Sequence, residues 1–131
     1  MHLMIPVSPG ELVDKITILD IKSERISDSA KLANVRRERE LLAQIWQESG
    51  LETGAVEALR DALKSVNEKL WVIEDAIRDE ERAGRFGDRF IELARSVYVT
   101  NDERATIKKA INQALGSGIV EEKSYSDYRH A

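Results

Sequence analysis

The chain contains no cysteine in its 131 residues. This absence excludes disulfides, thiol nucleophiles and cysteine-ligated zinc, and it fits the reducing cytoplasm in which we expect the protein to reside. Proline, glycine and aromatic residues are scarce, so turn-forming residues are few and helices are favoured. No apolar run approaches about 20 residues, and we therefore expect no segment that spans a membrane.

Histidine is confined to the two ends of the chain, at His2 and His130. An interior without histidine offers neither the Glu-x-x-His pairs of di-metal bundles nor a Ser-His-Asp set. No glycine-rich loop has the spacing of a phosphate-binding or dinucleotide-binding motif. We therefore expect no metal and no cofactor. The formal net charge of −4 also argues against a broad nucleic-acid-binding surface.

The spacing of apolar residues predicts an all-α fold in one domain, residues 1–131. We expect an antiparallel bundle of about five helices, preceded by an N-terminal arm at 1–7 and followed by a C-terminal tail at 119–131. Ser8, Pro9 and Glu11 form a capping box with proline at the first helical position, so the first helix begins there. A second helix is predicted from about Ala30 to Glu48.

The third predicted helix carries the most regular pattern in the chain. It is a long central helix that ends near Gly84 and needs at least one long partner, from this chain or from a second copy. Its apolar residues follow heptad spacing and form a coiled-coil-like seam. They are Val56, Leu59, Leu63, Val66, Leu70, Ile73 and Ile77.

The segment "ARSVYVTNDERATIKK" places a polar break between two helix-like runs. Thr100 and Glu103 form a second capping box, so we expect the fourth helix to end here and a fifth to begin. Free backbone N–H groups at such a helix start, together with cations, can hold a phosphate or a carboxylate. The predicted residues of this small-anion site are Arg95, Tyr98, Arg104 and Lys108. The competing interpretation is that these cations pair with acids, Asp75 of the third helix among them.

A polar line lies beside the seam of the third helix: Asn67, Trp71, Glu74 and Arg78, with Asp75 next to it. It either docks another helix of the same domain or lines a polar cleft or subunit interface. A magnesium site built on Asp75 and Asp79 is the weaker alternative to a solvated acidic face. On the first helix, Lys15 shares a side with apolar residues, and we expect it to be partly buried and to need an acid partner, for which a carboxylate of the third helix is the natural candidate. A structural ion pair is favoured here over a catalytic lysine.

Long blocks of the sequence resemble a family of small all-helical bacterial and phage proteins of unknown function. The resemblance lies in VSPGELVDKITIL, KLANVRRERELL, VNEKLWVIED, ELARSVYVTNDERA and VEEKSY, from Val7 to about Tyr128. It implies a stand-alone helical unit that is sometimes appended to larger proteins. It implies no activity, cofactor or catalytic residue.

The missing catalytic apparatus and the long seam together favour a non-enzymatic helical binding module. Its expected partner is a second copy in a homodimer, or another protein. The alternative is an enzyme or binder for a small anion in a cationic cleft. The first helix is loosely similar to that of helical chorismate mutases, which need no nucleophile. The alternative requires Lys15, Arg78, Arg95 and Arg104 to converge on a pocket with an unpaired cation.

Overall fold

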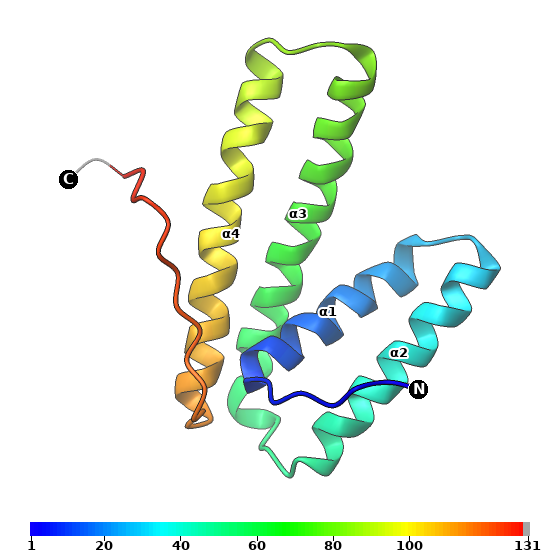
Figure 1. Ribbon diagram of the computed structural model, residues 1–131, viewed down its shortest axis with the longest axis vertical. Helices are drawn as coiled ribbons and strands as arrows, with labels where there is room; N and C mark the ends of the chain where they lie inside the picture. Colours follow the sequence, from blue (N-terminus) through cyan, green and yellow to red (C-terminus); the bar gives the residue numbers. More distant parts are fainter. Residues whose placement is uncertain (130–131) are drawn as a thin grey trace.

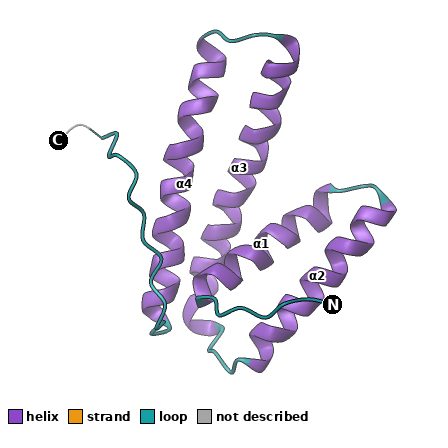
Figure 2. Ribbon diagram, in the orientation of Figure 1, coloured by secondary structure: helices purple, strands orange, loops and turns teal. Residues whose placement is uncertain are grey.

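The computed structural model describes residues 1–129 and folds them into four α-helices without strands (Figures 1 and 2). The helices are α1 (Pro9–Arg25), α2 (Ser29–Glu48), α3 (Glu57–Ala83) and α4 (Asp88–Ala114), and a 3₁₀ turn at Gly54–Val56 precedes α3. They form two helical hairpins. The α1–α2 hairpin crosses the lower half of the longer α3–α4 hairpin, so the molecule has the outline of a V.

The first two helices begin where the sequence predicts. The Ser8 side chain caps α1 by accepting a hydrogen bond from the Glu11 N–H, and Pro9 occupies the first helical position. Asp28 caps α2 in the same way, through the N–H of Lys31. These caps confirm the predicted turn between the two helices, although α2 starts at Ser29 rather than Ala30.

The seam of α3 is satisfied within the chain, because α4 lies alongside α3 over its whole length. Leu63 and Val66 of α3 are buried, as is Leu93 of α4. Gly84 ends α3 in the left-handed conformation, with φ 69°, as its position in the sequence predicts. The heptad seam therefore requires no second copy.

The prediction of five helices is wrong, because α4 runs without interruption through the expected break. Thr100 is 5% exposed and sits on the inner side of this continuous helix. A capping pattern starts a helix only where the preceding backbone leaves the helical conformation. Here α4 packs against α3 on both sides of Thr100, and this packing keeps the backbone of α4 helical. The predicted antiparallel bundle is likewise not confirmed, since α1 crosses the α3–α4 pair obliquely and α2 packs against α1.

The hydrophobic core lies where α1 crosses the other helices. Leu12 and Ile16 of α1 meet Leu63 of α3, Ile111 of α4 and Trp46 of α2 in one buried cluster. The indole N–H of Trp46 donates to the Thr53 hydroxyl at 3.1 Å, which satisfies its polar atom. The core thus fixes α1 between the two hairpins.

The upper part of the α3–α4 hairpin extends beyond this core. We name residues 68–83 and 88–103 the projecting hairpin. The described polar contacts of α1 with α3 reach up to Asn67, and those with α4 reach up to Arg104. At about 1.5 Å per residue, the projecting hairpin is about 24 Å long. It stands clear of α1 and α2 in Figure 1.

The chain ends are extended. Residues 1–7 leave the start of α1 as an arm on which Leu3, Met4 and Ile5 are more than 70% exposed. The tail after α4 runs back along that helix without regular structure as far as residue 129 (Figure 1). No helix in residues 1–129 is long and apolar enough to cross a membrane.

Candidate functional site

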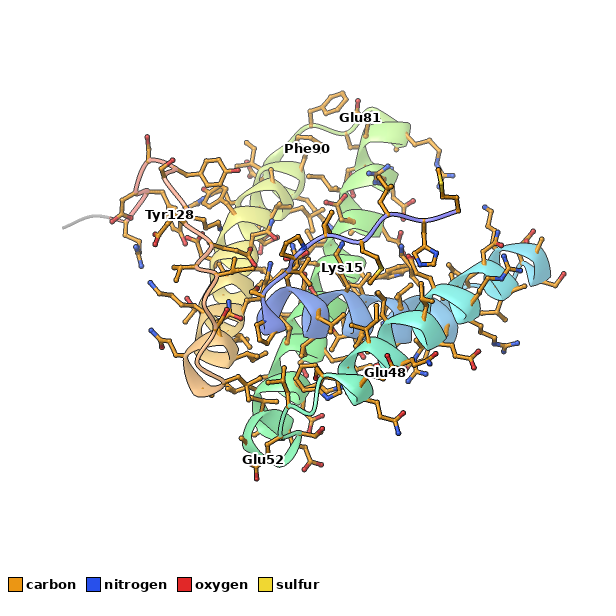
Figure 3. All side chains as sticks on the ribbon, turned by 60° about the horizontal axis from the view of Figure 1, so that its bottom comes forward. Lys15, Glu48, Glu52, Glu81, Phe90 and Tyr128 are labelled. Atoms are coloured by element: carbon orange, nitrogen blue, oxygen red, sulfur yellow. The ribbon has the colours of Figure 1, made fainter. Side chains whose placement is uncertain are left out.

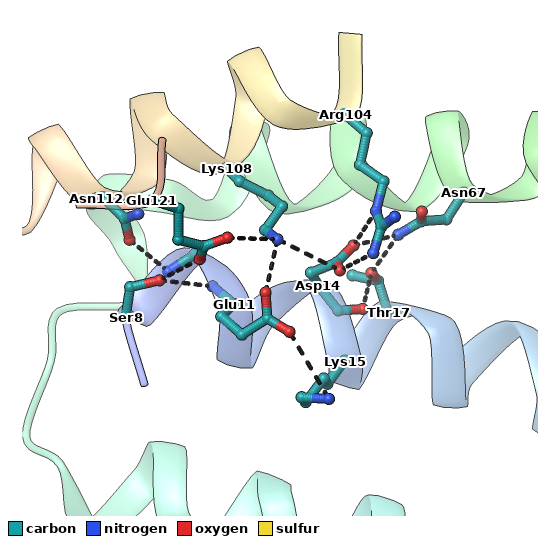
Figure 4. A network of polar contacts seen from close by, with 11 residues as sticks. Ser8, Glu11, Asp14, Lys15, Thr17, Asn67, Arg104, Lys108, Asn112 and Glu121 are labelled. Carbon is teal, nitrogen blue, oxygen red and sulfur yellow. Dashed lines mark hydrogen bonds and ion pairs between the residues drawn. The ribbon is translucent and has the colours of Figure 1, made fainter. Parts of the chain in front are cut away.

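The densest polar cluster lies where the first turns of α1 cross the second half of α4 (Figure 4). Gly10 makes this crossing possible: a Cβ on Gly10 would lie 2.5 Å from the carbonyl oxygen of Lys108. The Gly10 N–H donates to Asn112 Oδ1 at 2.7 Å. The absence of a side chain therefore brings the two backbones close enough for side chains of α1 and α4 to pair.

Asp14 is the centre of the cluster and is 1% exposed. Its carboxylate accepts both a 3.0 Å hydrogen bond from Arg104 Nε and a second, shorter one from the terminal nitrogen of the same guanidinium. Asn67 Nδ2 donates to Asp14 at 2.9 Å and to Thr17 Oγ1 at 3.1 Å. A buried carboxylate needs this number of donors, because each unmet hydrogen bond in the interior is costly. Asp14 thus ties α1 to both α3 and α4.

Lys108 lies one helical turn after Arg104 and joins two more carboxylates. Its Nζ lies 2.6 Å from Glu11 Oε2 and 3.2 Å from Glu121 Oε2 of the tail. The other oxygen of Glu121 accepts a 2.9 Å hydrogen bond from the buried hydroxyl of Ser8. Glu121 therefore fastens the tail to the residue that caps α1.

The pKa values of both cations respond to this pairing. The hydrogen bonds that Arg104 donates to Asp14 raise the pKa of Arg104 and outweigh the opposing effect of burial. For Lys108, burial acts to lower the pKa, but the hydrogen bond to Glu11 and the charge of that carboxylate, with further contributions from Asp14 and Glu121, raise it. Both side chains are therefore held in the charged state.

The predicted site residues fall into two groups. The cluster brings together Asn67, Arg104 and Lys108, with Lys15 at its edge. Lys15 is half exposed and pairs at 3.7 Å with Glu11 of its own helix. The expectation that Lys15 is partly buried against a carboxylate of α3 is therefore wrong.

The other predicted residues lie away from the cluster. Glu74 and Arg78 form an exposed ion pair on α3 at 3.3 Å. Tyr98 packs against Tyr128 of the tail, with ring centroids 4.8 Å apart. Three further residues make no ion pair or side-chain hydrogen bond within residues 1–129: Trp71, which is half-buried, and Asp75 and Arg95, which are exposed.

The predicted helix start that was to supply free N–H groups at Thr100 does not exist. Lys15, Arg78, Arg104 and Lys108 each have a carboxylate within 4 Å. Arg95, which has none in residues 1–129, lies outside the cluster. Arg104 and Lys108 line one cavity between α4 and the tail, together with Tyr98, but Lys15, Arg78 and Arg95 do not. The four cations that the small-anion alternative requires therefore do not converge on one pocket.

The sequence analysis missed five members of the cluster: Ser8 as a partner of the tail, Glu11, Thr17, Asn112 and Glu121. It also gave no role to Asp14. The signal that was available is an acid placed among the apolar residues Leu12, Val13 and Ile16. An aspartate in such a position must be paired when the helix is buried on several sides.

A family model covers residues 3–129, almost the whole chain; its description is "Family of unknown function (DUF6165)". The chain belongs to DUF6165. No curated protein and no solved structure matches it. The DUF6165 match confirms the resemblance to a family of unknown function.

In this DUF6165 chain the cluster links α1, α3, α4 and the tail by hydrogen bonds and ion pairs. Every buried side-chain nitrogen and oxygen in residues 1–129 has a hydrogen-bond partner. In the same residues, no group of three or more acidic or histidine side chains is placed to hold a metal ion.

Proposed function

We propose that the protein is a non-enzymatic helical binding module and that it associates with a second copy of itself through the projecting hairpin. The observation that carries this proposal is that α1, with α2 packed against it, covers only the lower half of the α3–α4 hairpin. Two helices alone bury one seam, and their remaining faces stay in solvent.

The distribution of exposed apolar side chains supports a binding role for this region. Apart from Leu41, every large hydrophobic residue that is well exposed in the described chain lies in the arm, the projecting hairpin with its turn, or the tail. Those on the projecting hairpin and its turn are Val72, Phe86, Ile91, Tyr98 and Val99. A standard protein interface takes about 20–30 residues from each partner, which the projecting hairpin is large enough to supply.

The pairing of the cations favours this proposal over an enzyme that acts on a small anion. Electrostatic catalysis requires a cation that is aimed at the substrate and is free to stabilise it. In the cluster, Arg104 and Lys108 are already neutralised by Asp14, Glu11 and Glu121.

Light scattering and sedimentation equilibrium of the full chain test the proposal. We expect a dimer at tens of micromolar and a clear weakening by Val72→Glu/Ile91→Glu, since both residues are about half exposed on the projecting hairpin. The matched control is Ile119→Glu/Val120→Glu, which places the same charges on exposed residues of the tail. A monomer at these concentrations, or equal effects of the two double variants, contradicts the proposal.

A further inference from the structure

Cations without an intramolecular ion pair gather at one end of the V. Within residues 1–129, seven cationic side chains have no carboxylate within ion-pair distance, and five of them surround the α1–α2 turn. We name this set the basic turn. Its members are Lys22, Arg25, Lys31, Arg36 and Arg37.

The acids near the basic turn do not neutralise it. Glu24 is engaged by a lysine of α3, and Asp28 caps α2. Glu38 and Glu40, which follow on α2, form no ion pair with any described cation. Residues 22–37 contain five cations against two carboxylates, on a chain whose formal net charge is −4. The basic turn therefore presents positive charge to solvent.

The opposite pattern holds at the free end of the projecting hairpin. Of the five cations at this end, four are paired locally: Arg78 with Glu74, Arg82 with Asp79, and both Arg85 and Arg89 with Glu80; Arg95 makes no ion pair within residues 1–129. Four carboxylates at this end make no ion pair within residues 1–129 and are exposed, and we name them the acidic tip. They are Asp75, Glu81, Asp88 and Glu92.

Within one molecule, the basic turn and the acidic tip cannot meet. The two hairpins diverge from the core, and the backbone of α2 does not approach α3 or α4 anywhere in residues 1–129. Figure 3 places Glu81 at the far end of α3, away from the α1–α2 hairpin. Satisfying both charged ends therefore requires a second molecule.

We propose that the basic turn of one copy docks on the acidic tip of a second copy, in a two-fold dimer. This inference rests on the proposed self-association and names the contact that directs it. In a two-fold arrangement the contact is made twice, because each copy contributes one basic turn and one acidic tip. Two V-shaped molecules joined in this way place each α1–α2 hairpin beside the uncovered part of the partner's projecting hairpin.

A nucleic acid fits the basic turn less well than a second copy does. Residues 22–37 contain no aromatic side chain on which a base can stack, and the acidic tip of the same molecule repels phosphates. The acidic tip is opposite in sign to the basic turn and nearly equal to it in number of charges, four carboxylates against five cations. Charge complementarity therefore favours the second copy.

The experiment is sedimentation equilibrium of the full chain from low to high salt, with single-residue variants and a mixture. Arg37→Glu reverses one charge of the basic turn, and Lys109→Glu makes the same change at an exposed cation of α4 outside it. Since the contact occurs twice, we expect Arg37→Glu to weaken the dimer about tenfold or more, and Lys109→Glu to change it little. High salt is expected to weaken the wild-type dimer through screening.

The mixture supplies the rescue. Glu81→Arg is expected to weaken the dimer alone. Mixing it with the Arg37→Glu chain is expected to restore association, because the arginine introduced in one chain can pair with the glutamate introduced in the other. A dimer that is indifferent to salt and to Arg37→Glu overturns this inference but leaves the proposed self-association standing. A monomeric chain overturns both this inference and the proposed self-association. If that monomer also binds a labelled oligonucleotide in an Arg37-dependent manner, the basic turn binds nucleic acid instead of a second copy.

Discussion

Replacing Asp14 by asparagine tests whether the buried ion-pair network holds the helices together. Asparagine has nearly the same shape but one oxygen instead of two, and its amide carries hydrogens toward donors. In the unmodified chain, the Asp14 carboxylate accepts two hydrogen bonds from Arg104 and one from Asn67. Hydrogen bonds to charged groups contribute about 1.5–3 kcal/mol each. The Arg104 side chain is 29% exposed, so water recovers part of the loss.

We therefore expect Asp14→Asn to lower the free energy of unfolding by about 3 kcal/mol. This value is at the lower end of the range of costs for breaking a buried ion pair. With a urea m value of about 1.5 kcal/mol/M, the unfolding midpoint falls by about 2 M in circular dichroism at 222 nm. The control Glu74→Gln removes an exposed pair and is expected to change stability by about 0.3 kcal/mol.

The reasoning also predicts strong coupling between Asp14 and Arg104. In a double-mutant cycle with Arg104→Gln, the double variant is expected to lose about 2 kcal/mol less than the two single losses added together. A loss below about 1 kcal/mol for Asp14→Asn, or additive losses in the cycle, refutes the view that this carboxylate fixes α1 on α3 and α4.

Two further predictions concern the crossing of α1 with α4 and the docking of the tail. Gly10→Ala forces a methyl group against the Lys108 carbonyl and Asn112 Oδ1, and we expect it to lower the unfolding free energy by about 2 kcal/mol in urea titrations; an unchanged midpoint contradicts the close approach. The hydrogen bond from Lys123 lowers the pKa of Asp102, so this contact stabilises tail docking above the ordinary aspartate pKa and is lost as pH falls through the depressed value. NMR titration of the Asp102 carboxyl is expected to show a midpoint below about 3.9, which Lys123→Ala raises.

Local sequence signals predicted the parts of the fold that depend on neighbouring residues. The Ser8 cap, the heptad seam of α3 and the left-handed Gly84 each follow from residues within a few turns of one another. The same local logic failed at Thr100, where a capping pattern is present but packing against α3 keeps the helix continuous. Capping preferences are worth about 1 kcal/mol, and a buried seam outweighs them.

The ion-pair network could not be predicted because its members are far apart in the sequence. Asp14 is separated by 53 residues from Asn67 and by 90 from Arg104. Which cation reaches a buried acid depends on how two hairpins cross. The crossing brings the backbone of α4 against Gly10, at a position where the sequence suggests only a helix start.

The 2.9 Å hydrogen bond from the Ser8 hydroxyl to Glu121 Oε1 holds the start of α1 beside the tail that follows α4. The four-helix body can therefore be closed by a short linker after trimming the arm and the outer tail, and a circular permutant can be opened at the surface connection between α2 and α3 instead. The same adjacency means that a host protein can carry this body as an insertion in a single loop, without separating the two ends of that loop.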